Sequence, residues 1–219
     1  MELLHPRSSE GRRSAHDSRE LRTIPDWTLA GERAHVVQFY EDDSFLVELL
    51  SRFVGAALVT GDVAIVVATE RRRAALGERL RARGLDLAIP LAQRRYFPLD
   101  AAATLERFMR RGSPDPQLFD ELVGGLLADA AKAAAGGRGR IAAFGEMVAL
   151  LWAEGKIEAA LQLEELWNKT ADQYSFSLCC AYPMNGFLGN PHAAPFLKIC
   201  AQHSHVFPAE RRRSFAAAY

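Results

Sequence analysis

The chain has 219 residues, of which 49% are apolar, enough for one compact domain with a full hydrophobic core. Its 27 basic and 27 acidic side chains cancel, so no overall charge draws the protein to nucleic acids or acidic lipids. No apolar run approaches the roughly 18–20 residues of a membrane-spanning helix, and residues 1–30 lack the apolar centre of a signal peptide, so we expect a cytoplasmic protein without membrane contact.

Composition divides the chain into three parts. Residues 1–32 are rich in Ser, Arg, Glu and Gly with few apolar side chains, which predicts a flexible N-terminal arm. Residues 33–208 alternate apolar and amphipathic runs, as a folded domain does. Residues 209–219 then form a short C-terminal tail.

Strands and helices alternate along the domain. Short apolar runs bounded by turn residues predict strands at 35–40, 63–68, 94–97, 140–144 and 175–182. Amphipathic runs predict helices at 45–58, 70–83, 102–110, 117–135, 156–174 and 191–203. This order predicts an α/β fold with three layers, in which a mostly parallel central sheet is flanked by helices.

The first two strands have the layout that begins a P-loop ATPase core, but the phosphate loop is missing. A P-loop needs glycines, whose backbone N–H groups surround phosphate, and a lysine that neutralises it. The connection after the first strand is instead Glu41-Asp42-Asp43-Ser44, whose three carboxylates would repel a triphosphate. We therefore expect a degenerate P-loop fold without ATP hydrolysis, catalytic residues or a bound cofactor.

In parallel α/β sheets, ligands bind beyond the carboxyl ends of the strands, and carboxylates follow four of the five predicted strands. One of them, Glu146, stands where a RecA-like ATPase would place an acid for Mg²⁺ or water. It could equally form a hydrogen bond to a neighbouring loop. Farther along, Glu164 and Asn168 share one helix face and could bind a polar ligand or each other.

Other side-chain clusters are weaker candidates. Trp152 and Trp167 stand at helical spacings typical of core aromatic residues. The arginine run at 71–73 is interpreted as a solvated helix face. A second arginine run, at 211–213, lacks the interleaved aromatic residues of nucleic-acid-binding segments.

No motif marks an enzyme or a metal centre. The chain has no Gly-x-Ser-x-Gly elbow, and its cysteines have no local nucleophile motif. We expect no metal site, because no Cys-x-x-Cys pair anchors one. The candidate ligands are Cys179, Cys180, Cys200 and His203, which could converge, with His35, only if the fold brings them together.

These motifs together resemble the MEDS domain family, the sensory domain named for methanogen and methylotroph regulators, over residues 34–208. Their order and spacing carry the match more than any single block. In chain order the blocks are His35-Val36-Val37-Gln38-Phe39-Tyr40-Glu41, Gly61-Asp62, Ala68-Thr69-Glu70, Gly145-Glu146, Leu151-Trp152-Ala153-Glu154-Gly155, Ala160-Leu161 to Trp167-Asn168, Leu178-Cys179-Cys180-Ala181-Tyr182-Pro183 and Ile199-Cys200-Ala201-Gln202-His203-Ser204.

The resemblance implies a sensor related to the RecA/KaiC fold with a degenerate phosphate loop. Such domains are input modules of transcriptional regulators and histidine kinases, and the resemblance implies small hydrocarbon derivatives as ligands. No helix-turn-helix or kinase segment accompanies this domain, and the arm at 1–32 is too short and polar for one. We therefore expect action on a partner protein and no direct binding to nucleic acid.

The sequence thus predicts a non-catalytic cytoplasmic sensory module that binds a small ligand and regulates a partner kinase or transcription regulator. Three alternatives stay open: a nucleotide-binding domain without hydrolysis, a protein-interaction antagonist in a phosphorelay, and a thiol or metal sensor. Self-association also stays open. The predicted ligand-binding residues are His35, Tyr40, Glu41, Glu146, Trp152, Glu164, Asn168, Tyr182 and His203.

Overall fold

The computed structural model describes residues 33–136, 138–187 and 193–210, so the predicted arm and all but the first two residues of the predicted tail lie outside it. A six-stranded sheet in the order β3-β2-β6-β7-β1-β8 forms its centre, and every strand pair in it is parallel. The strands are β1 (His35–Tyr40), β2 (Val63–Ala68), β3 (Tyr96–Asp100), β6 (Ile141–Gly145), β7 (Ser177–Pro183) and β8 (His205–Phe207).

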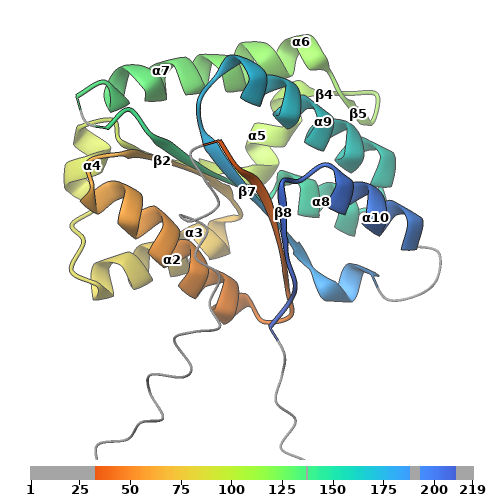
Figure 1. The fold of residues 1–219 in the computed structure, drawn as a ribbon, viewed down its shortest axis with the longest axis horizontal. Helices are drawn as coiled ribbons and strands as arrows, with labels where there is room; N and C mark the ends of the chain where they lie inside the picture. The colour runs from red at the N-terminus through yellow and green to blue at the C-terminus, as the bar shows by residue number, and fades with distance from the viewer. Residues whose placement is uncertain (1–32, 137, 188–192, 211–219) are drawn as a thin grey trace, which may run out of the picture.

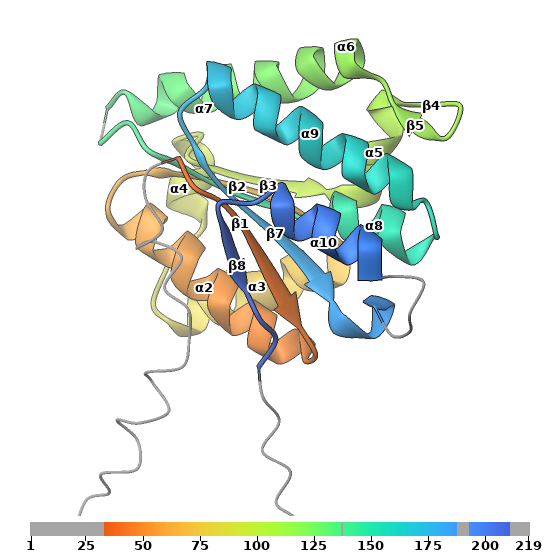
Figure 2. The same ribbon diagram turned by 45° about the vertical axis from the view of Figure 1, so that its right-hand side comes forward.

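Helices cover both faces of this sheet (Figures 1 and 2). One face packs against α2 (Asp43–Val59) and α3 (Glu70–Ala82), with α4 (Ala88–Ala92) near the edge formed by β3. The other face packs against α5 (Ala101–Phe108), α6 (Pro116–Phe119), α7 (Gly125–Ala134), α8 (Met147–Ala153), α9 (Ile157–Gln173) and α10 (Ala193–Ala201). The predicted three-layer α/β fold is therefore confirmed.

Burial on both faces explains the composition of the inner strands. All six residues of β1 and all six of β2 are buried, and β2 reads Val-Ala-Ile-Val-Val-Ala. Parallel strands covered by helices on both sides favour such continuous apolar runs. Adjacent residues point to opposite layers. Cys179 accordingly packs with α2 and α3, and Cys180 packs with α8 and α9, as the alternation of a strand predicts.

The turns around α2 follow from local chemistry. Asp42 caps the helix, because its side chain accepts the backbone N–H of Ser44 at 2.7 Å. At the other end, Gly61 has φ +84°, a conformation that glycine adopts without strain, and the Thr60 hydroxyl donates to Asp62. The predicted strands at 35–40 and 63–68 are confirmed at both ends.

The third strand begins and ends later than the predicted range of 94–97. Strand β3 begins at Tyr96, because Arg94 adopts φ +54° and ends the preceding turn. Residues 98–100, expected to follow the strand, belong to it. Asp100 also caps α5 through the backbone N–H of Ala103.

Smaller departures concern short elements. The predicted helix at 117–135 is one continuous run that contains a π-helical turn at Asp120–Gly124. The predicted helix at 102–110 ends at Phe108 and leads into the hairpin of β4 (Met109–Arg110) and β5 (Ser113–Pro114). Strand β8 and helices α4 and α8 were not predicted, since three to seven residues give too little periodicity. Within the described residues, no helix is both long and apolar enough to cross a bilayer.

Candidate functional site

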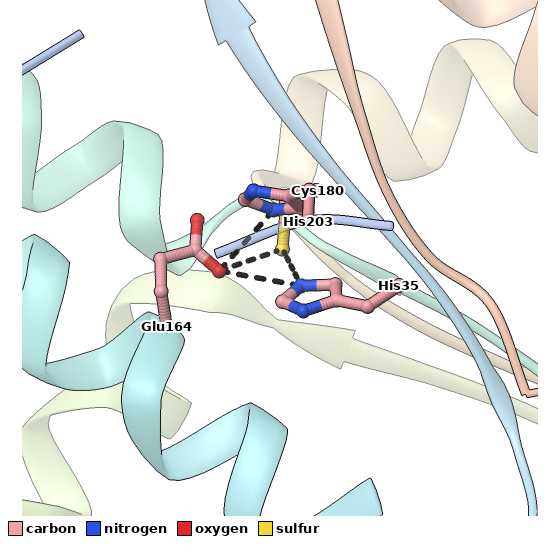
Figure 3. A group of neighbouring side chains, drawn as sticks. All are labelled: His35, Glu164, Cys180 and His203. Carbon is pink, nitrogen blue, oxygen red and sulfur yellow. Dashed lines mark hydrogen bonds and ion pairs between the residues drawn. The ribbon is translucent and has the colours of Figure 1, made fainter. Parts of the chain in front are cut away.

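Two buried glutamates on opposite faces of the sheet organise the polar side chains. The first group, which we call the Glu164 centre, lies between the sheet and α9 (Figure 3). It joins residues from β1, α9, β7 and the segment after α10, which are far apart in sequence. Its members are His35, Glu164, Asn168, Cys180, Tyr182 and His203.

Four groups converge on the Glu164 carboxylate. The Tyr182 hydroxyl donates to Oε1 at 2.7 Å. The other oxygen, Oε2, lies 3.3 Å from Nε2 of His35, 3.4 Å from Sγ of Cys180 and 3.5 Å from Nε2 of His203. This oxygen is therefore the point at which both imidazoles and the thiol meet.

Burial sets the electrostatics of this centre. Glu164 is 0% exposed. Burial alone raises its pKa, but His203 and the hydrogen bonds from His35 and Tyr182 outweigh that effect and leave the pKa below 4.5. Burial lowers the pKa of His203 and raises the pKa values of Cys180 and Tyr182 well above their ordinary range. Without a bound cation, the centre thus holds a carboxylate beside a thiol and a phenol that keep their protons.

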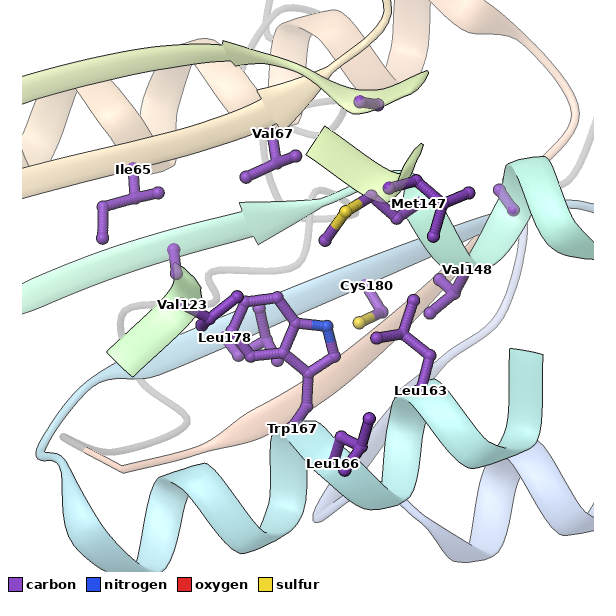
Figure 4. Packing of buried hydrophobic residues seen from close by; sticks show 14 of the residues in the cluster. Ile65, Val67, Val123, Met147, Val148, Leu163, Leu166, Trp167, Leu178 and Cys180 are labelled. Atoms are coloured by element: carbon purple, nitrogen blue, oxygen red, sulfur yellow. The ribbon is translucent and has the colours of Figure 1, made fainter. Parts of the chain in front are cut away.

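An apolar shell surrounds the centre. Figure 4 shows Met147, Val148, Leu163 and Trp167 packed around the side of β7 that carries Cys180. Such a shell keeps water away and strengthens every electrostatic interaction within it.

The second group, the Arg72 centre, lies on the α2–α3 face at the carboxyl ends of β1, β2 and β6. Arg72 donates from Nε to Glu146 at 3.0 Å, and from Nη2 to the Tyr40 hydroxyl at 2.9 Å and to Asp43 at 3.1 Å. Its guanidinium also stands 5.2 Å from the centroid of the Tyr40 ring. Glu146 further accepts the backbone N–H of Thr69 at 2.9 Å, so the carboxylate does bond to a neighbouring loop.

The arginine dominates the electrostatics of this second group. Burial alone lowers the pKa of Arg72, but Glu146 and Tyr40 more than offset it, so the guanidinium stays charged. For Tyr40, burial raises the pKa to about 12, against the opposing effect of Arg72. The Arg72 centre therefore contains a permanent positive charge, which Glu146 faces at 3.0 Å, and a protonated phenol at neutral pH.

A cleft of about 800 Å³ opens above this ion pair, between α2 and α3. Arg72, Glu146 and Thr69 line its inner end. Asp43 and Ser44 from the start of α2 line its rim, and Val47, Ala75 and Ala82 add apolar wall. The cleft stands where ligands of parallel α/β sheets bind.

The turn between β1 and α2 is occupied by carboxylates of the chain itself. The backbone N–H groups of Glu41 and Asp42 both donate to the Glu210 carboxylate, the latter at 2.6 Å. Together with the Asp42 cap, this leaves the turn with the negative character that the sequence predicts for it.

The structure thus distributes the predicted ligand-binding residues over both faces. His35, Glu164, Asn168, Tyr182 and His203 come together in the Glu164 centre. Tyr40 and Glu146 belong to the Arg72 centre, and Glu41 is exposed in the turn beside it.

Trp152 is core, as the helical spacing predicts. Its indole N–H donates to the Gly186 carbonyl at 2.8 Å, and its ring stacks on Phe187 at 4.4 Å and meets Tyr182 edge-on. It therefore packs beside the Glu164 centre and away from the cleft.

Arg72 is the residue that the sequence interpretation missed. The sequence predicts a solvated helix face for the run at 71–73, but the side chain of Arg72 is 7% exposed, against 87% for Arg71. Helical spacing holds a usable signal, because Arg72, Leu76 and Leu80 share one face at i, i+4 and i+8, and both leucines are buried.

The four candidate metal ligands of the sequence do not all meet. Cys180 and His203 converge, whereas Cys179 points to the opposite layer and half-buried Cys200 is not in the group.

A comparison with protein families identifies one match. The family model described as "MEDS: MEthanogen/methylotroph, DcmR Sensory domain" matches residues 34–191, which is more than half of the chain. No curated protein compared with the chain matches it significantly. The match spans most elements of both centres, from His35 to Tyr182.

Proposed function

Because the chain belongs to the MEDS family of sensory domains, we propose that it is a non-catalytic cytoplasmic module that binds a small molecule and signals to a partner protein. The observation that carries this proposal is the cleft beside the Arg72–Glu146 ion pair. Its volume of about 800 Å³ falls within the roughly 300–1,000 Å³ of small-molecule sites.

The lining of the cleft indicates the chemistry of the ligand. The lining supplies charged and hydrogen-bonding groups from Asp43, Arg71, Arg72, Glu78, Arg79 and Glu146. Val47 and Ala75 offer a short apolar wall. A small organic molecule with a polar head and a short hydrocarbon body fits this combination, in line with the hydrocarbon derivatives that the family resemblance implies.

The contacts of Arg72 offer a route from ligand to partner. Arg72 belongs to α3, and its bond to Asp43 ties the first turn of α2 to it. A ligand that competes for Asp43 would shift the population of α2–α3 arrangements, and a partner that contacts these helices could detect the shift. We propose a histidine kinase or a transcription regulator as that partner.

A thermal-shift screen tests ligand binding. The probes are short-chain alcohols, carboxylic acids and halogenated one- and two-carbon compounds, with ATP and Mg²⁺ as the probe for residual nucleotide binding. A ligand of the native state raises the melting temperature in proportion to its saturation. A rise with ATP alone would favour the nucleotide-binding alternative, which the carboxylates around the β1–α2 turn argue against.

Two matched variants show whether a hit occupies the cleft. Ala75→Phe fills the cleft from α3, whereas Ala74→Phe adds the same ring on the exposed side of the same helix. The shift should disappear in Ala75→Phe and persist in Ala74→Phe. Equal shifts in both variants would place the ligand elsewhere, and no shift with any probe would count against this ligand class.

A further inference from the structure

The Glu164 centre has no role in the cleft, yet it gathers four metal-binding side chains in the interior. One ligand atom from each of His35, Glu164, Cys180 and His203 lies within 4.8 Å of every other. The side chains of His203 and Glu164 are both 0% exposed, and that of His35 is 7% exposed. Burying this many ionisable groups together is costly unless they satisfy one another or bind an ion.

Hydrogen bonds on the outer side fix the orientation of both imidazoles. Nδ1 of His203 lies 2.7 Å from the Ile199 carbonyl oxygen, which can only accept, so this nitrogen is the donor. Nδ1 of His35 lies 2.8 Å from Oδ1 of Asn168. The Asn168 amide is oriented by its NH₂ group, which donates to two oxygens of Gln202, so Nδ1 of His35 is a donor as well.

Whenever these rings are neutral, the lone pair of each Nε2 is therefore directed toward the Glu164 carboxylate. In that form two electron-pair donors face a third at 3.3 and 3.5 Å, which is repulsive. Nε2 of His203 has no hydrogen-bond partner among the described residues. A divalent cation among these atoms would turn the repulsion into four bonds, and imidazoles held from behind through Nδ1–H are typical of metal ligands.

The distances agree with tetrahedral coordination. Nitrogen, oxygen and sulfur ligands at 2.0–2.3 Å from a tetrahedral zinc ion are about 3.3–3.7 Å from one another. The contacts of His35 with Glu164 and Cys180 measure 3.3 and 3.4 Å, and Cys180 lies 3.4 Å from Glu164. These side chains therefore need no large rearrangement to complete a tetrahedral coordination shell around an ion.

The charges of the four side chains also match those of a divalent ion. A divalent ion with one carboxylate, one thiolate and two neutral imidazoles makes a neutral unit, which suits an apolar interior. The Cys180 thiol loses its proton to solvent as the Sγ–metal bond forms, so binding is expected to release one proton from this residue.

We propose that His35, Glu164, Cys180 and His203 bind one divalent transition-metal ion of the zinc type. The mixed sulfur, nitrogen and oxygen ligand set favours zinc over magnesium or calcium. Four protein ligands fill a tetrahedral shell, as in structural zinc sites. The ion would join β1, β7, α9 and the segment after α10, and this assignment revises the expectation of no metal.

Metal analysis of the chain, with two adjacent cysteines as a matched pair, tests the proposal. After expression with zinc and extensive dialysis, wild type and Cys179→Ala should hold about one zinc ion per chain, whereas Cys180→Ala should hold far less. Both variants remove one buried thiol from the same strand, so a general packing defect would affect both. Equal zinc retention by the two variants would mean adventitious binding elsewhere and would overturn the proposal.

Two further measurements keep the test decisive if Cys180→Ala folds poorly. Zinc added to chelator-treated wild type should raise its melting temperature, and Co²⁺ should give the visible absorption of a thiolate-bound tetrahedral ion. Asn168→Ala removes the Nδ1 partner of His35 and should weaken zinc binding about 10–100-fold. Wild type that shows no zinc, no thermal shift and no cobalt spectrum would refute the site, whatever the outcome of the ligand screen at the cleft.

Discussion

Glu146 and Glu164 are both buried glutamates beside the same sheet, but their partners differ. Glu146 pairs with Arg72, whose charge is permanent. Within the described part of the chain, Glu164 has only histidine partners for ion pairing, together with a tyrosine and a cysteine. The contrast suggests different uses: the first carboxylate is neutralised by the protein itself, whereas the second is arranged to share its charge with a proton or a metal ion.

Position reinforces this contrast. The Arg72 centre forms the inner end of an open cleft, so its ion pair is in reach of a ligand. The Glu164 centre is closed by the helices of the opposite layer. Accessibility suits a sensor that samples its surroundings, and closure suits a structural ion.

The largest expected effect comes from removing the permanent charge. Arg72→Met leaves Glu146 buried without its cation, which typically costs about 3–5 kcal/mol of unfolding free energy. Urea denaturation measures this loss. The double variant Arg72→Met/Glu146→Leu should recover much of it, because no unpaired charge remains.

Arg71→Met is the control for that experiment. Arg71 contacts Asp43 at 3.4 Å but is 87% exposed, so its loss should change the unfolding free energy by less than about 1 kcal/mol. A loss as large as that of Arg72→Met would show that the arginine run acts through its total charge, and not through the buried pair.

The two tyrosines offer a sharper comparison. Tyr182→Phe removes a 2.7 Å hydrogen bond to the fully buried Glu164 carboxylate and should cost about 1.5–3 kcal/mol. Tyr40→Phe removes an acceptor from Arg72, which retains Glu146 and Asp43, and should cost less. Chelator-treated protein should be used for both measurements, and the reverse ranking would contradict the view that Glu164 depends on its neutral partners.

Alkaline pH should affect the Arg72 centre through Tyr40. The pKa of this phenol rises from 10.0 to about 12 on folding, because burial favours the neutral form. A raised pKa in the native state contributes stability that is complete below pH 10 and is lost as the pH rises toward 12. Tyr96 and Tyr182 also have raised pKa values, so the difference between wild type and Tyr40→Phe isolates the effect. That difference should shrink above pH 10, and a constant difference would argue against the shift.

Asp43→Asn should have the smallest effect on stability. The side chain of Asp43 is 48% exposed, and Arg72 keeps its bond to Glu146, so we expect a change below about 1 kcal/mol. If Asp43 couples the cleft to α2, the same variant should still alter the affinity for any compound that the thermal-shift screen identifies.

Much of the fold follows from local sequence patterns. The continuous apolar runs of β1 and β2 specify buried parallel strands, because both faces of such strands must be apolar. The acids at 41–43 predict a turn without phosphate chemistry, which stays a prediction. Strand β8 could not be predicted, because three residues take their strand conformation from pairing with β1.

For the candidate sites, the sequence determined which side chains carry the chemistry, and the i, i+4 spacing already put Glu164 and Asn168 on one face. It also determined that Cys179 and Cys180 diverge, since adjacent strand residues point to opposite faces. Only the tertiary structure decided which residues meet. His35 reaches Glu164 because β1 lies beside β7, and Arg72 reaches Glu146 because β2 lies beside β6. Pairing between strands that are distant in sequence is a property of the assembled sheet, and the local periodicity of the sequence does not specify which strands pair.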